Sequence, residues 1–232
     1  MTRFPFFRPL LPGTQLWPRV LAVIGAVMGI SLTIVVCLQF PMAAGDVPII
    51  VAPIGASAVL VFAVPSSPLA QPWSVVGGNI LSTLVGVGIA RVVPEPTLAA
   101  GLAVGGAILV MSLARCLHPP GGAAALTAVI GSPAIHAAGY AFAFAPVALN
   151  SIALVSLAMF FHRMTGHSYP HVPVAPPARV DEARAAAGFH LEDIDRALED
   201  MHESFDISRE DLDLLLSQAE LHAMARRGAE AP

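Results

Sequence analysis

The sequence predicts an all-α, polytopic membrane protein in which a transmembrane helical bundle is followed by a water-soluble helical hairpin. The chain is 56% hydrophobic and only 12% charged, whereas soluble domains carry roughly 25% charged residues. The charges are also unevenly placed. Residues 18–164 contain two acids and four arginines, while residues 179–232 contain 14 acids and 6 arginines, a net charge of −8 (6 − 14). An apolar membrane part is therefore followed by an acidic tail.

Six apolar segments divide the membrane part. A helix that crosses the bilayer needs about 20 apolar residues, and four of the segments reach that length. The second segment is borderline and the fifth is too short. The bundle therefore has either six short, tilted crossings, which we favour, or four crossings with two re-entrant segments. The segments are 18–39, 47–64, 73–93, 97–117, 119–133 and 138–162.

The two short segments begin with proline and glycine, in Val51–Ala58 and His118–Ala125. Proline is tolerated in the first turn of a helix because its missing N–H would be unpaired there anyway. Each segment is therefore predicted to be a short helix that starts at its prolines and has irregular backbone before it. Such backbone persists at membrane depth only where it is buried in protein or lines a wet cavity.

The two halves of the membrane part resemble each other. Leu21–Ala26 matches Leu102–Ala107, the two Pro/Gly-rich segments line up, and each half ends in a long span with one asparagine, Asn79 or Asn150. The pattern is a pseudo-repeat of long helix, short broken helix and long helix. Interrupted apolar segments at matching places in two halves indicate the binding site of a transporter.

The strongest local candidate for a binding site runs from Arg115 to Gly122 and combines a fixed cation, an imidazole and a glycine-rich helix start. Free backbone N–H groups and the helix dipole make a helix N-terminus attractive to anions. The Gly55–Ser57 segment would supply the matching half-site, so that two helix N-termini meet at an anion-attracting cavity. Uncharged polar side chains would add hydrogen bonds. The candidate substrate-binding residues are Arg115, His118, Pro119, Pro120, Gly121, Gly122, Gly55, Ala56, Ser57, Asn79, Thr127 and Asn150.

Several of these residues also have structural interpretations, which the sequence leaves open. Arg115 could be an anchor at the membrane interface, and the His118 ring could satisfy a buried carbonyl at a helix cap. Asn79 and Asn150 could form hydrogen bonds between helices. Small residues recur every fourth position, for example in residues 78–86, which we interpret as ordinary packing within the chain rather than as a dedicated dimer face.

Other classes of function find little support. No nucleophile has an evident base partner, no paired carboxylates lie in the membrane part, and no nucleotide-binding or zinc-protease motif occurs. We therefore expect no enzymatic activity and no cofactor. The histidines in residues 162–171 lie at a membrane exit and in a linker, and we expect no metal there. The net charge of −4 argues against nucleic-acid binding, which requires a basic face.

The chain is predicted to have four regions. These are a cytoplasmic N-terminal segment (1–17), a transmembrane domain (18–164), a linker (165–189) and an acidic amphipathic helical hairpin (190–227). No cleavable signal peptide stands apart from the first span, and arginines near the ends of the membrane part place both termini in the cytoplasm. The apolar face of the hairpin requires a partner surface, so a cytoplasmic partner is expected.

Several motifs in the same order resemble those of the HPP family of integral membrane proteins, over most of residues 5–171. The resemblance implies a compact membrane domain usually described with four transmembrane helices. Plant and cyanobacterial members are associated with nitrite transport, and many bacterial members carry C-terminal CBS modules, which bind adenine nucleotides. Residues 188–227 look like the linker that precedes those modules, and we expect either a member without them or a truncated chain. The motifs are His118–Ala123, Ala52–Leu60, Pro68–Trp73, Gly77–Asn79 and Phe161–His167.

The sequence and the resemblance together predict a transporter or channel for a small monovalent anion, with nitrite as the first candidate. We expect a multi-pass protein of the bacterial inner membrane. Its expected partners are the lipid bilayer and a small inorganic anion, and it is expected to form a homo-oligomer. The alternative is a membrane sensor or scaffold that signals through the acidic C-terminal helices.

Overall fold

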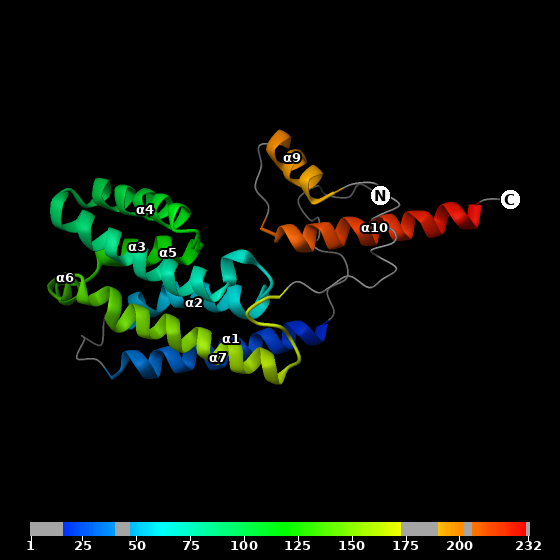
Figure 1. Cartoon of the computed structure of the whole chain (residues 1–232). Helices are drawn as coiled ribbons and strands as arrows, with labels where there is room; N and C mark the ends of the chain where they lie inside the picture. The colour runs from blue at the N-terminus through cyan, green and yellow to red at the C-terminus, as the bar shows by residue number, and fades with distance from the viewer. Residues whose placement is uncertain (1–15, 40–46, 173–189, 202–205, 231–232) are drawn as a thin grey trace, which may run out of the picture.

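The computed structural model describes residues 16–39, 47–172, 190–201 and 206–230, and all regular elements in these ranges are helical. Figure 1 shows a bundle of helices with two further helices, α9 and α10, beside one end. The predicted all-α fold is therefore confirmed. The elements are α1 (Leu16–Cys37), α2 (Val47–Ala63), η2 (Pro68–Ala70), α3 (Pro72–Val92), α4 (Pro96–Leu113), α5 (Pro119–Ile130), α6 (Pro133–Ala138), η3 (Ala143–Ala148), α7 (Leu149–Met164), α9 (Leu191–Met201) and α10 (Arg209–Glu230).

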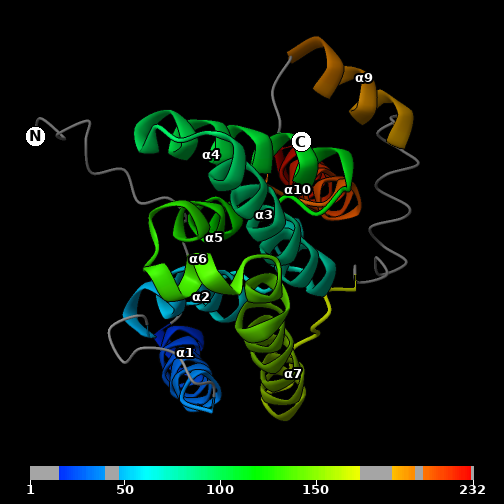
Figure 2. The same cartoon turned by 90° about the vertical axis from the view of Figure 1, so that its left-hand side faces the viewer.

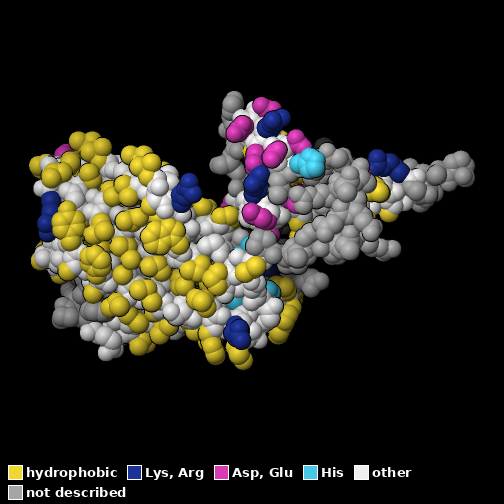
Figure 3. All heavy atoms as spheres, in the orientation of Figure 1, with side chains coloured by type: hydrophobic (Ala, Val, Ile, Leu, Met, Phe, Trp, Pro, Cys, Tyr) yellow, Lys and Arg dark blue, Asp and Glu magenta, His cyan; other side chains and the backbone are white. Residues whose placement is uncertain are grey.

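Four helices are long and apolar enough to cross a membrane: α1, α3, α4 and the continuous run of η3 and α7. The 12 residues of α5 extend only about 18 Å, against a hydrocarbon core of about 30 Å. Large apolar side chains such as Val23, Leu109 and Phe160 are exposed on the outside of the bundle, which Figure 3 shows covered with hydrophobic atoms. Since this surface suits lipid rather than water, the chain is a polytopic membrane protein.

The chain reverses direction at every helix of the bundle, as the colour gradient in Figure 1 shows. Helices α1, α3 and α5 run one way, and α2, α4 and α7 run the other way. The start of α1 and the end of α7 therefore lie at the same end, beside α9 and α10, which we call the tail end. Helix α6 lies at the opposite end, the far end. The arrangement amounts to six passes through the bundle, in which α2 and α5 are the short ones.

The third helix of each half packs mainly against the other half. Helix α3 contacts α4 and α5, whereas α7 contacts α1 and α2, and the two short helices α2 and α5 meet in between. Figure 2 looks along the bundle and shows these two groups side by side. If α1, α2 and α3 are exchanged with α4, α5 and α7, each of these two groups becomes the other. The contacts therefore follow the predicted pseudo-repeat.

Glycines set the closest contacts between helices. A Cβ atom on Gly86 of α3 would lie 2.3 Å from the carbonyl oxygen of Ala125 in α5, and one on Gly25 of α1 would lie 2.4 Å from the Phe62 ring of α2. By contrast, Gly105 of α4 has no such neighbour within 4 Å. The small residues on α1 and α3 therefore serve packing within the chain, as predicted.

Prolines begin several helices, but Pro53 does not. Pro72, Pro96 and Pro119 each occupy the first helical positions, where a missing N–H costs nothing. Helix α2 instead begins at Val47, and Pro53 lies inside it. The prediction that the second segment starts at Pro53 is therefore wrong, because a proline inside a membrane helix is tolerated where neighbouring groups satisfy the freed carbonyl.

The connection between α3 and α4 offers a test of helix capping. The Glu95 carboxylate accepts hydrogen bonds from the backbone N–H groups of Leu98 and Thr97, and these bonds hold the pKa of Glu95 below its ordinary value. A lowered pKa stabilises the folded state above the ordinary pKa, and this stabilisation is lost as the pH falls through the lowered value. We expect Glu95→Gln to lower the thermal midpoint slightly at neutral pH, measured on detergent-purified protein. The difference from wild type should disappear at strongly acidic pH, and a difference that persisted there would contradict the role of the charge.

The tail helices contact the bundle at the tail end. The Ser67 hydroxyl donates a hydrogen bond to the Asp206 carboxylate at 2.7 Å, and His171 Nε2 lies 2.8 Å from an Asp211 carboxylate oxygen. The Gln71 side-chain oxygen also accepts a bond from the His171 backbone N–H. The turn that contains η2 is therefore tied to the start of α10.

Candidate functional site

Four uncharged polar side chains meet inside the bundle, and we call them the central polar cluster. They are Ser57 of α2, Asn79 of α3, His118 immediately before α5 and Ser151 of α7, and each is 0% exposed. The surrounding helices are apolar, so these side chains form an isolated polar region contributed by four different elements. Polar groups at such depth in a membrane protein are functional candidates by default.

The hydrogen bonds of the cluster fix the state of the His118 ring. Its Nδ1 lies 2.8 Å from the carbonyl oxygen of Leu69, and its Nε2 lies 2.8 Å from the Ser57 hydroxyl oxygen. A carbonyl oxygen only accepts hydrogen bonds, so Nδ1 carries the proton. In the neutral ring Nε2 is then an acceptor, and the Ser57 hydroxyl donates to it. His118 thus satisfies a buried carbonyl, as its structural interpretation required, and also joins the polar cluster.

Asn79 links the cluster to α7. Its Nδ2 donates to the hydroxyl oxygens of Ser57 at 3.4 Å and Ser151 at 3.1 Å. Its Oδ1 is buried and makes no hydrogen bond within the described part of the chain, and the same holds for the hydroxyl of Ser82, one turn further along α3. Leaving a buried polar atom unpaired costs about 1–3 kcal/mol, so such atoms in a native protein call for an explanation, of which a bound water molecule or ligand is one.

Two glycines let α3 and α5 approach closely enough for His118 to reach the cluster. A Cβ atom on Gly78 would lie 2.6 Å from the Cβ of His118 and 2.9 Å from the carbonyl oxygen of Cys116. A Cβ atom on Gly121 would lie 2.6 Å from the hydroxyl oxygen of Ser82. Larger residues at these positions would push α5 away from α3 and withdraw the ring from Ser57.

The start of α5 does not provide the backbone donors that the sequence predicted. Pro119 and Pro120 have no N–H, and the N–H of Gly121 donates to the carbonyl oxygen of His118 at 2.8 Å. Gly122 is half-buried beside Val104 of α4. The interpretation of this helix start as a row of free N–H groups for an anion is therefore wrong, because the two prolines remove the donors that such a site needs.

The predicted matching half-site on α2 is wrong for a related reason. Since α2 begins at Val47, the backbone N–H groups of residues 55–57 lie inside the helix rather than at its start. Gly55 is half-buried beside Ile30 of α1, and Ala56 is exposed. Of the three predicted residues only Ser57 reaches the central polar cluster, through its side chain.

Three further predicted residues lie outside the cluster. Asn150 is fully buried, but its Nδ2 donates to the Cys37 sulfur of α1 at 2.9 Å, which is the contact between helices that its structural interpretation required. The Thr127 hydroxyl donates to the Ala123 carbonyl within α5. Arg115 is exposed in the connection before α5, as an interface anchor requires, and its φ is 53°.

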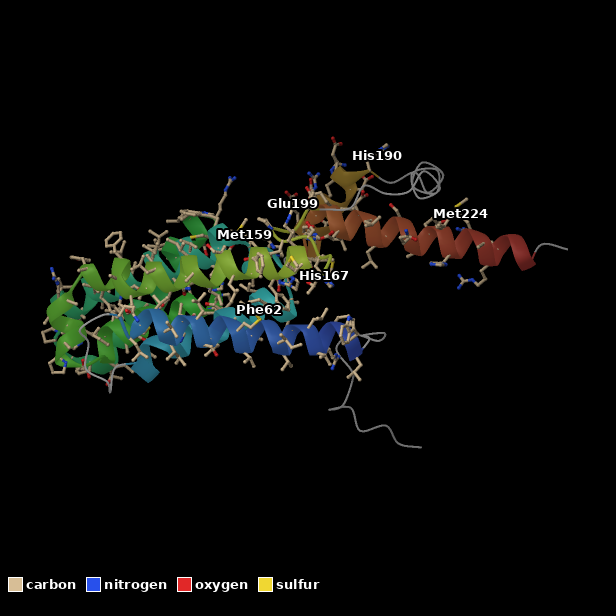
Figure 4. All side chains as sticks on the ribbon, turned by 90° about the horizontal axis from the view of Figure 1, so that it is seen from below. Phe62, Met159, His167, His190, Glu199 and Met224 are labelled. Atoms are coloured by element: carbon tan, nitrogen blue, oxygen red, sulfur yellow. The ribbon has the colours of Figure 1, made fainter. Side chains whose placement is uncertain are left out.

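The described part of the bundle has a small cavity near its centre and larger cavities at its two ends. The small central cavity of about 10 Å³ between α2, α5 and η3 has room for a single water molecule at most. A cavity of about 180 Å³ at the tail end is lined by Phe62 and His167, which Figure 4 shows on neighbouring elements. A cavity of about 140 Å³ at the far end is lined by Arg91 and His136. The central cavity is lined by Pro53, Ile54, Ala124, Thr127, Phe142 and Val147.

The structure adds partners that the sequence did not single out. Ser151 directly follows the predicted Asn150. As a polar residue within the apolar segment 138–162, it could have been identified as a candidate from the sequence. The Leu69 carbonyl carries no signal in the sequence, because any residue has one. The histidines at the membrane exit are engaged elsewhere: His162 Nε2 binds the Val61 carbonyl oxygen at 2.9 Å.

Comparisons with known proteins agree with the membrane architecture. A family model described as HPP, transmembrane region, matches residues 12–170. Two proteins of Dictyostelium discoideum, both described as transmembrane proteins, are 35% identical over 127 residues and 40% identical over 108 residues. These matches cover 53% and 45% of this chain but only 44% and 34% of the two relatives, so the chain spans less than half of their length. No solved structure shows significant similarity.

Proposed function

Because the chain belongs to the HPP transmembrane family, we propose that it moves a small monovalent anion across the membrane, with nitrite as the first candidate, through the central polar cluster. One observation carries the proposal. Four fully buried polar side chains from four elements meet in an apolar bundle, and the Oδ1 of Asn79 among them has no partner within the described residues. Unpaired buried polar atoms are uncommon in native proteins, and Asn79 combines one with hydrogen bonds to two other members of the cluster.

The charges of the membrane part favour an anion over a cation. Residues 18–164 contain four arginines and two acids, and Arg91 and His136 line the cavity at the far end. Clefts lined by one sign of charge raise the local concentration of the opposite ion. The cluster itself has hydroxyl, amide and imidazole groups but no fixed charge, which suits a small ion of single charge that must also leave.

The small size of the cavity between α2, α5 and η3 favours a transport mechanism in which the short helices move. The central cavity of about 10 Å³ is smaller than a three-atom anion needs, since one water molecule already requires about 10–15 Å³ of such space. Separate cavities lie at the two ends of the bundle. This arrangement supports an alternating-access carrier, in which α2 and α5 separate from their neighbours on one side at a time.

Anion uptake by purified protein in proteoliposomes tests the proposal. We expect saturable nitrite uptake that falls at least about tenfold in Ser57→Ala, because a buried hydrogen bond to the His118 ring is lost and its Nε2 is left unpaired. His222→Asn on the exposed surface of α10 is the control and should transport like wild type. The absence of uptake of nitrite, nitrate, formate and chloride by monodisperse protein would contradict the proposal.

A sensor or scaffold remains a second candidate because the tail is attached to the bundle through Ser67 and His171. The same assay separates the two. A chain that ends at residue 189 should still take up anions if the bundle is the transporter. If the tail is the functional part, neither the full chain nor the truncated chain should take up anions above the protein-free background.

A further inference from the structure

We propose that His118 takes up a proton when the central polar cluster takes up its anion, so that the protein moves one proton together with each anion. This inference rests on the proposed anion transport. It is carried by the directions of the hydrogen bonds around Ser57, which has one hydroxyl proton and three polar neighbours.

Without an anion, each hydrogen-bond donor of the cluster is committed. The Nδ1–H of His118 donates to the Leu69 carbonyl, so Nε2 needs the hydroxyl proton of Ser57. The Ser57 oxygen can then only accept from Asn79, which must present its Nδ2 to Ser57 and Ser151 and its Oδ1 to the other side. The neutral ring thus holds Asn79 with its Oδ1 as a buried acceptor that has no partner within the described residues, and an acceptor has the wrong polarity for an anion.

The surroundings keep the ring neutral as long as no anion is present. The elements packed against His118 are α2, η2 and α3, and within their described ranges they contain no carboxylate. A buried imidazolium without a counter-ion is costly, and the positive end of the α5 dipole opposes it further. The titratable groups bonded to the η2 turn are Tyr169, which donates to the Ala70 carbonyl, and Asp206, which accepts from Ser67, with His171 and Asp211 beside them. The other titratable or charged groups on these and the adjoining elements are Arg91 and Glu95 at the far end of α3 and start of α4, Arg115 and Cys116 before α5, and His162 and Arg163 on α7.

Protonation of His118 releases this constraint. A proton from water on Nε2 makes that atom a donor to the Ser57 oxygen, and the Ser57 hydroxyl becomes free to turn toward the Pro53 carbonyl, 3.2 Å away, or toward Asn79. The Asn79 amide can then rotate by half a turn. Its Oδ1 accepts from the hydroxyls of Ser57 and Ser151, and its Nδ2 takes the place of the former unpaired oxygen.

The rotated amide presents N–H donors where an acceptor stood, which is the polarity that an anion requires. The charge of the anion also compensates that of the imidazolium. The net charge of the cluster is therefore zero both with the proton and the anion bound and with neither bound. Proton and anion therefore favour each other's binding by the same factor. While the free ring is mostly neutral, the apparent affinity for the anion should rise about tenfold for each unit by which the pH falls.

Simultaneous measurement of nitrite, protons and charge tests the coupling. Wild-type protein is placed in vesicles that contain a pH-sensitive dye, and nitrite uptake above the protein-free background is compared with lumenal acidification. We expect one proton per nitrite and no response of the flux to a membrane potential set with potassium and valinomycin. Nitrite flux that moves charge without protons would overturn the inference and leave the proposed transport standing, whereas no flux at all would overturn both.

The variant His118→Asn separates the proton from the hydrogen bond. An asparagine amide can still donate toward the Leu69 carbonyl, but it cannot take up a proton at neutral or mildly acidic pH. We expect reduced nitrite flux that is independent of pH and responds to the membrane potential, while His222→Asn keeps the wild-type coupling. Proton-coupled flux in His118→Asn would overturn the inference, and if this variant does not fold, the charge measurement on the wild type decides alone.

Discussion

Replacing Asn79 with leucine should reduce anion uptake in proteoliposomes by about 100-fold or more. The change removes the two hydrogen bonds that join Ser57 to Ser151 and the only amide of the cluster that can turn toward a ligand. Each buried hydrogen bond contributes about 1–1.5 kcal/mol, and a combined loss of about 3 kcal/mol corresponds to about two orders of magnitude. Initial rates of nitrite uptake, normalised to reconstituted protein, provide the measurement.

Asn150→Leu is the matched control for this experiment. Asn150 is also an asparagine, is also fully buried and also has an unpaired Oδ1, but its Nδ2 binds Cys37 outside the cluster. The two substitutions should cost the fold a similar amount, so a difference in transport reports on the site. We expect Asn150→Leu to retain uptake within about tenfold of wild type. Equal losses in the two variants would show that the cluster has no special role.

Replacing Gly86 with alanine should destabilise the bundle by about 3 kcal/mol or more, at or above the upper end for overpacked cores. The added methyl group would lie 2.3 Å from the carbonyl oxygen of Ala125 and 2.9 Å from its Cα, both backbone atoms that cannot turn away. Helices α3 and α5 would have to separate, and the polar cluster between them would open. In a protein of this length the expected loss lowers the thermal midpoint by about 6–12 °C.

Gly105→Ala provides the comparison on α4. An added methyl group there has no neighbour of this kind within 4 Å, and alanine is the better helix former. Its thermal midpoint in detergent should stay within about 2 °C of wild type, since surface changes are usually within ±0.5 kcal/mol. If Gly86→Ala also left the thermal midpoint within about 2 °C of wild type, α3 and α5 would not pack as closely as described here.

The helices could be predicted from the sequence because apolar length and proline position are local signals. The segment 119–133 became α5 at Pro119–Ile130, and the segment 97–117 became α4 at Pro96–Leu113. The error at Pro53 shows the limit of the proline rule. Proline marks a helix start only when nothing upstream continues the helix, and residues 47–52 do continue it.

The site could be predicted only in part, because side-chain and backbone contributions leave different traces in a sequence. His118, Ser57 and Asn79 stand out as polar residues among apolar ones, and the structure brings these three together. The Leu69 carbonyl has no such trace. The predicted backbone anion site is wrong because Pro119 and Pro120, which begin α5, have no N–H to donate.

The exchange of third helices between the two halves has a consequence for biosynthesis. A ribosome completes α3 before α4 and α5 exist, so the principal packing partners of α3 are still missing when it enters the membrane. Helix α7 is the last helix of the bundle to be synthesised, and it packs against α1 and α2, which are synthesised first. Neither half can complete its packing without the other. In a nascent chain that stopped between α3 and α4, the packing face of α3 would be exposed to lipid.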